Sequence, residues 1–71
     1  MLLEELLRRN KRLGEQTDKV YMVRHFRKRF DSQTLTEICY NNAQLLTSIL
    51  DTIDAHPDWD DETVAENVEF N

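Results

Sequence analysis

The segment from residue 34 to residue 55 has the clearest hydrophobic pattern in the chain. Its inner positions recur every three or four residues, and on a helix they fall within an arc of about 140°. Thr34 followed by Glu37 fits a capping box, with Ser32 as the alternative cap, and Pro57 ends the helix near residue 55. The pattern predicts one long amphipathic helix whose inner face is formed by Leu35, Ile38, Cys39, Asn42, Leu45, Leu46, Ile49, Leu50 and Ile53.

The first thirty residues carry two apolar stripes on opposite sides of a helix. One straight helix cannot bury both stripes against the same neighbour. Gly14 is a good helix terminator and Thr17 or Asp18 can cap a restart, so we expect a break within residues 14–18. A continuous helix whose ends face different partners, as in an intertwined dimer, is the alternative. The first stripe comprises Leu2, Leu3, Leu6, Leu7 and Leu13, extended by Val20 and Tyr21, and the second comprises Met22, Val23, Phe26 and Phe30.

The last fifteen residues, 57–71, are acidic and sparsely apolar. Asp58 is a suitable N-cap, and acidic side chains in the following turn favour a helix N-terminus through the helix dipole. We expect either a short docked helix or a tail that becomes ordered on binding, anchored by Trp59.

Together these patterns predict an all-α fold. The chain has one Gly and one Pro, and β-branched residues nowhere alternate with polar ones as they do in a half-buried strand. We expect a helical-hairpin domain over residues 1–56, turning at Asp31 and Ser32, and then a short acidic segment over residues 57–71.

A homodimer follows from the width of the stripe on residues 34–55. The stripe is wide for a two-helix monomer, so a four-helix bundle of two chains is the simplest way to bury it. Asn42 either fixes the register of such a dimer or reaches water at the edge of the stripe. The candidate dimer-interface residues are Ile38, Asn42, Leu45 and Ile49.

Charge is divided unevenly along the chain. All nine Lys and Arg residues lie between Arg8 and Arg29. After Arg29 there are ten Asp and Glu residues and no Lys or Arg, and the net charge of the chain is -5. This asymmetry is typical of a nucleic-acid or membrane surface joined to an acidic tail. It also fits two halves that fold against each other with their charges partly matched.

Size and cysteine content indicate the compartment. A chain of 71 residues forms at most one small domain, and its single cysteine excludes an internal disulfide. No apolar run matches a signal-peptide core or a membrane span. We therefore expect a cytoplasmic protein that does not enter a membrane.

The basic stretch RHFRKRF, residues 24–30, divides in two when it is placed on a helix. Phe26 and Phe30 turn inward with the apolar positions. The outward side chains are spaced at i, i+3, i+4 and i+7, so they form a compact patch that can stack a base and hold phosphates. The alternative is a solvated face whose cations serve the acidic half. The candidate partner-binding residues are Tyr21, Arg24, His25 and Lys28.

No pattern indicates catalysis, a cofactor or a metal site. The acidic run that begins at Asp54 alternates like a calcium loop, but Trp59 stands where that loop needs glycine and Ala65 where it needs glutamate. Cys39 has no cation within a helical turn to lower its pKa, which favours a buried hydrophobe over a nucleophile. We predict no enzyme, no cofactor and no bound metal.

Function is indicated mainly by exclusion. Small size and helical regularity favour a non-enzymatic protein-interaction module, acting as a regulator, adaptor or inhibitor that binds another protein as well as itself. The alternative is a nucleic-acid-binding regulator that uses the basic N-terminal arm. In a third hypothesis the acidic tail acts alone, shielding that arm or imitating nucleic acid.

Overall fold

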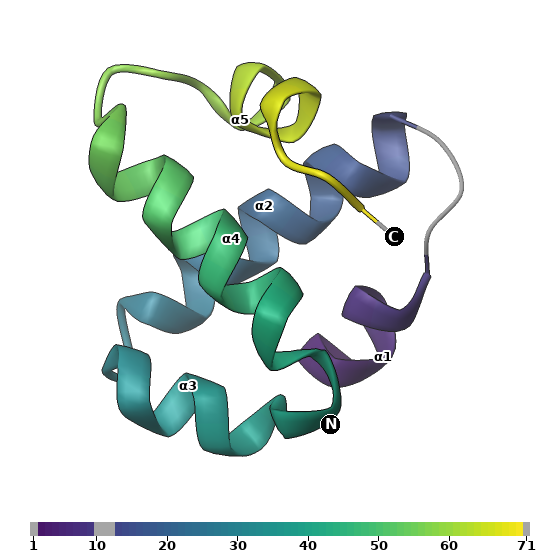
Figure 1. Cartoon of the computed structure of the whole chain (residues 1–71), viewed down its shortest axis with the longest axis vertical. Coiled ribbons are helices and arrows are strands. Elements are labelled where there is room, and N and C mark those ends of the chain that lie inside the picture. The colour runs from purple at the N-terminus through teal and green to yellow at the C-terminus, as the bar shows by residue number, and fades with distance from the viewer. Residues whose placement is uncertain (1, 10–12, 71) are drawn as a thin grey trace.

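The chain folds into five α-helices, seen in a computed structural model that describes residues 2–9 and 13–70 (Figure 1). A short 3-10 helix, η1, lies between the third and fourth α-helices. The described residues contain no strand, so the all-α prediction is confirmed. The elements in chain order are α1 (Leu2–Arg8), α2 (Leu13–Arg27), α3 (Ser32–Ile38), η1 (Tyr40–Asn42), α4 (Ala43–Ala55) and α5 (Asp61–Asn67).

Helix α2 is the centre of the arrangement, because it contacts each of the other four α-helices. In Figure 1 it crosses behind α4, and α5 packs beside it. The radius of gyration is 10.7 Å, close to the value of about 11 Å expected for a folded chain of this size. A single chain is therefore compact without a partner.

The core is one cluster to which every α-helix contributes. Helices α1 and α2 contribute Leu3, Leu7, Val20 and Val23 to this core. The core therefore contains side chains from both stripes of the first thirty residues. Because α1 and α2 are separate helices, both stripes can face the same core. The remaining buried members are Leu35, Cys39, Leu46, Ile49, Leu50, Ile53, Val64, Ala65, Val68 and Phe70.

The single helix predicted over residues 34–55 is wrong, because the chain bends between α3 and α4. The backbone leaves the helical region at Cys39 (φ −107°, ψ 34°) and at Asn42 (φ −124°, ψ 28°), and asparagine is a poor helix former. A straight helix of that length would extend about 33 Å, more than the 26 Å of the longest axis of the molecule. The bend lets both halves of the stripe face one core.

The predicted break in the N-terminal arm is present between α1 and α2, but its position is wrong, since residues 14–18 lie inside α2. Helix α1 ends at Arg8 and α2 begins at Leu13, so the chain leaves the helix before Gly14. A glycine ends a helix by adopting positive φ, and Gly14 does not adopt it. It sits in the exposed first turn of α2 with open space where a Cβ would point.

Aspartates cap α3 and α5 in the same way. The Asp31 carboxylate accepts a hydrogen bond of 2.7 Å from the Thr34 backbone N–H, and Asp60 accepts one of 2.8 Å from Thr63. The predicted caps at Thr34 or Ser32, and at Asp58, are therefore wrong, because in each case an aspartate three positions before a threonine takes the N-cap. The prediction that α4 ends before Pro57 is confirmed.

The C-terminal segment is a docked helix, one of the two outcomes expected from sequence. Its buried side chains, from Val64 to Phe70, belong to the common core. Before α5, Trp59 is half-buried and stacks on His56, with ring centroids 3.6 Å apart and planes inclined by 3°. The apolar face of residues 34–55 is thus covered within one chain, so a second copy is not needed to bury it.

Candidate functional site

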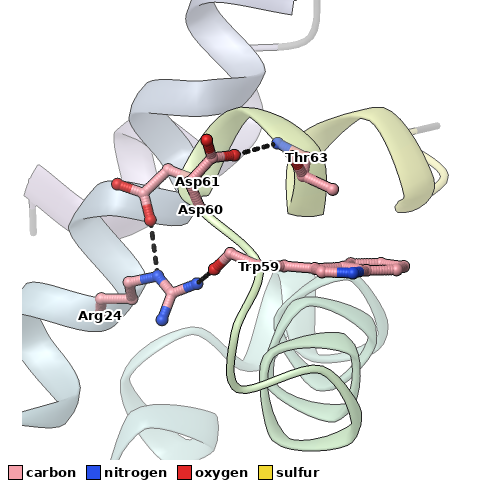
Figure 2. Close-up of polar contacts among 5 residues, drawn as sticks. All are labelled: Arg24, Trp59, Asp60, Asp61 and Thr63. Carbon is pink, nitrogen blue, oxygen red and sulfur yellow. Dashed lines mark hydrogen bonds and ion pairs between the residues drawn. The ribbon is translucent and has the colours of Figure 1, made fainter.

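Helical spacing places Arg24 among the outward side chains of the basic stretch, but in the structure Arg24 faces α5 instead of solvent. Its Nε donates to Asp61 Oδ1 at 2.5 Å, and its Nη2 donates to the Trp59 carbonyl oxygen at 2.9 Å (Figure 2). Both charged side chains of this pair are less than a third exposed. Arg24 therefore fastens α2 to the start of α5 and is not free for an external partner.

Arg27 is engaged in a second link between the two halves of the chain. Its guanidinium donates two parallel hydrogen bonds to the Asp54 carboxylate, of 2.6 Å and 3.0 Å, which join α2 to α4. This bond raises the pKa of Arg27 and lowers the pKa of Asp54.

Phe26 and Phe30 pack against the core and stack on each other, with centroids 6.3 Å apart. The structure thus places both phenylalanines inward, as expected from the sequence.

Four exposed side chains form a narrow row along α2 and the turn that follows its last residue, Arg27. Asp18, Tyr21, His25 and Lys28 are all exposed, and at 100° per residue they fall within an arc of about 80°. We call this set the α2 outer row. The Tyr21 and His25 rings stack, with centroids 6.5 Å apart and planes inclined by 15°. Among the described residues, neither Asp18 nor Lys28 has an ion-pair partner.

An apolar groove runs beside this row, where α1 meets α2. It has a volume of about 310 Å³ and is lined by Leu2, Leu6, Asp18, Tyr21 and Met22. We call it the α1–α2 groove. Leu2 is 61% exposed and Tyr21 is 57% exposed, so two of the four large hydrophobic side chains found exposed in the described part line this one groove. Large exposed apolar side chains that gather at one place mark an interaction surface.

The sequence predicts that the leucines of the groove belong to a core stripe, whereas Leu2 is exposed. On a helix, Leu2 and Leu6 point about 100° away from Leu3 and Leu7, which are the buried pair. A stripe of four leucines is therefore wider than one neighbour needs, and that width was the available signal for a second, exposed face.

The four candidate dimer-interface residues are not brought together on an open surface. Ile49 is fully buried, while Ile38 and Leu45 are half-buried and pack on the edge of the core. Asn42 is also half-buried, and its Nδ2 is buried without a hydrogen-bond partner among the described residues. A second copy could reach Ile49 only if the chain unpacked.

Cys39 is fully buried beside Glu4 of α1. Burial, followed by the charge of Glu4, raises the pKa of the Cys39 thiol to about 11. Because the thiolate is the nucleophilic form, such a thiol is unreactive at neutral pH. This environment matches the expected role as a small buried hydrophobe.

The described residues hold neither a metal-ligand cluster nor a membrane-spanning helix. Within residues 2–9 and 13–70, no three His, Cys, Asp or Glu side chains gather as a metal ion would require. In those ranges, no helix combines the length and the apolar character needed to cross a bilayer.

Comparisons with known proteins add no further constraint on the site. The chain matches no protein-family model, and searches of curated proteins and of solved structures likewise return no match.

Proposed function

We propose that the chain is a non-enzymatic protein-interaction module, a regulator, adaptor or inhibitor that binds protein through the α1–α2 groove and the α2 outer row. The observation that carries the proposal is the exposure of Leu2 and Tyr21 on one groove of about 310 Å³. A tyrosine ring offers a large and rigid contact area with a polar tip, which is why tyrosine is enriched at the centres of interfaces.

The surrounding charges support a protein partner. Asp18 lies at the groove and Lys28 lies at the other end of the outer row, so both signs of charge flank the apolar centre. An apolar centre with a polar, charged rim is the usual anatomy of a protein interface. A nucleic-acid surface would instead carry cations throughout.

A nucleic-acid function has one feature in its favour, a hollow of about 260 Å³ lined by Arg24, Arg27, Lys28 and Ile53. Two of its three cations are already held by carboxylates, Arg24 by Asp61 and Arg27 by Asp54. A phosphate would have to displace those partners, so this function is the less favoured one.

Photo-crosslinking tests the proposal, because the chain offers a matched pair of exposed tyrosines. Tyr21 lies at the groove, whereas Tyr40, which is 74% exposed, does not line it. Each is replaced in turn by a benzophenone-bearing phenylalanine, and the full chain is irradiated in the native cell extract. We expect protein adducts from position 21 and far fewer from position 40. Equal yields, no adduct at either position, or adducts that nuclease removes would contradict the proposal.

A further inference from the structure

We propose that the α1–α2 groove and the α2 outer row are covered by a second copy of this chain, with the two α2 helices antiparallel about a two-fold axis. The inference rests on the proposed function, because it names the partner of the same surface. It places the dimer interface on α2 instead of on the buried face of α4.

The outer row is complementary to itself in one orientation. Asp18 lies five positions before Val23 and Lys28 lies five positions after it, while Tyr21 and His25 lie two positions to either side. An antiparallel pair centred on residue 23 therefore places Asp18 opposite the partner's Lys28, and Tyr21 opposite the partner's His25. The same contacts recur on the other side of the axis, as an isologous interface requires.

The charges also specify the direction of the pair. Asp18 and Lys28 are ten positions apart, about 15 Å at the helical rise, so an ion pair forms at each end of the contact and the stacked rings meet between them. A parallel pair would place Asp18 opposite Asp18 and Lys28 opposite Lys28, which repel each other. Neither side chain has an ion-pair partner among the described residues, so both are free to pair.

The rest of the surface fits the same occupant. The α1–α2 groove lies beside the outer row, so Leu2, Leu6 and Met22 are covered when the row is covered. Of the cations near the outer row, Arg24 and Arg27 are already bound to Asp61 and Asp54. Arg29 is exposed beside Lys28, at the end of the contact where the partner's Asp18 lies, so its charge adds to that attraction. Because the contact comprises only the outer row and the groove beside it, we expect a weak dimer that dissociates at roughly tens to hundreds of micromolar.

Charge reversal in solution tests the arrangement. The full chain is followed by sedimentation equilibrium between about 5 and 500 µM at low salt. We expect Asp18→Lys and Lys28→Asp each to weaken the dimer by at least about tenfold, because each places like charges opposite each other. The double variant Asp18→Lys/Lys28→Asp should dimerise like the wild type. An equimolar mixture of the two single variants should form a heterodimer.

Asp58→Lys is the control, since it makes the same charge change at an exposed position outside the outer row. It should leave the dimer unchanged. A wild-type chain that stays monomeric over the whole range overturns the inference, as do single variants that dimerise normally or a double variant that does not recover. If the dimer is overturned in this way, photo-crosslinked adducts of position 21 with a different protein would still support the proposed function. The absence of any protein adduct would contradict both the dimer and the proposed function.

Discussion

The Lys19 ammonium lies over the Phe70 ring, with Nζ 5.1 Å from the ring centroid. Lys19 is fully buried, and among the described residues its Nζ has no hydrogen-bond partner. Burial lowers the pKa of Lys19 below its ordinary value of 10.5, while the charge of Glu15 acts in the opposite direction. This contact joins the end of the described chain to α2, but it keeps a charge away from water.

Lys19→Met should therefore stabilise the fold. Methionine fills a similar volume without a desolvated ammonium, and we expect the free energy of unfolding to rise by about 1 kcal/mol at pH 7. Urea denaturation followed by circular dichroism measures the change. Lys28→Met, at an exposed position of the outer row, is the control and should change stability little. A less stable Lys19→Met variant would show that the ring contact outweighs the desolvation.

The pH dependence of this difference has a definite sign. The folded chain holds the Lys19 proton less tightly than the unfolded chain, so stability rises with pH between the lowered pKa and 10.5. The advantage of Lys19→Met over the wild type should shrink as the pH approaches 10.5. An advantage that is constant from pH 7 to about 10 would contradict the lowered pKa.

Asp60 should be needed for the stability of α5, because it is the N-cap that accepts from Thr63. Asp60→Ala removes the acceptor and should lower the melting temperature by a few degrees, whereas Asp60→Asn keeps an acceptor and should lower it less. Thermal unfolding at pH 7 compares the two variants. Equal losses would indicate that the carboxylate charge matters more than the hydrogen bond.

Acid should destabilise the protein through the same carboxylates. Hydrogen bonds from Thr34, Arg27 and Thr63 lower the pKa values of Asp31, Asp54 and Asp60 below 3.8. The stabilisation is present above 3.8 and is lost as the pH falls through the lowered values, because the unfolded chain binds protons first. Asp60→Asn should make the fall in melting temperature below pH 4 shallower than in the wild type.

Arg24→Ala should destabilise more than any other single arginine substitution on α2. It removes two hydrogen bonds and leaves Asp61 and the Trp59 carbonyl without their partner, at a cost of roughly 1–2 kcal/mol. Arg27→Ala should cost less, because Asp54 is 57% exposed and the pair is screened by salt. Arg29→Ala, at an exposed position without an ion-pair partner among the described residues, is the control. Equal losses for Arg24→Ala and Arg29→Ala would contradict the role of Arg24 in fastening α2 to α5.

Two adjacent leucines of α4 provide a matched test of the bend between α3 and α4. Leu46 is fully buried and Leu45 is half-buried at the edge of the core. Leu46→Ala should cost roughly 2–5 kcal/mol, while Leu45→Ala should cost less than half as much. Urea denaturation measures both. A larger loss at Leu45 would favour the straight amphipathic helix, in which both leucines face a partner.

Cys39 should react with thiol reagents only when the chain opens. It is fully buried and its pKa is raised to about 11, so modification by a disulfide reagent at pH 8 should follow the population of open chains. The rate should rise with urea below the unfolding transition. Ser48→Cys in a Cys39→Ala background, at an exposed position of α4, should react quickly without urea. Fast reaction of Cys39 in the native protein would contradict its burial.

Much of the fold follows from helical periodicity, and the exceptions have a common cause. Period 3.6 identifies Leu35, Leu46, Ile49 and Ile53 as core positions, and all four are buried. The bend at Cys39–Asn42 is not visible in that period, because the same residues satisfy it whether the helix is straight or bent. The bend accompanies a packing of η1 against α1, a contact between segments distant in sequence that helical periodicity does not report.

Helical periodicity also fails to predict part of the candidate site, because it does not report contacts between distant segments. Tyr21, His25 and Lys28 are exposed as their spacing predicts, whereas Arg24 is not. The partner of Arg24, Asp61, lies 37 positions further along the chain, and nothing local to residues 24–30 distinguishes a cation that pairs within the fold from one that does not.

That separation of 37 positions between Arg24 and Asp61 also determines when the protein can fold. A nascent chain exposes the basic helix early, but the carboxylate that fastens it and the apolar side chains of α5 that cover it come last. Contacts that close long loops have to wait for both ends. The N-terminal half can pack α1 against α2 in advance, but the common core includes side chains from Val64 to Phe70, so the domain should complete its structure only once residues 59–70 have been synthesised.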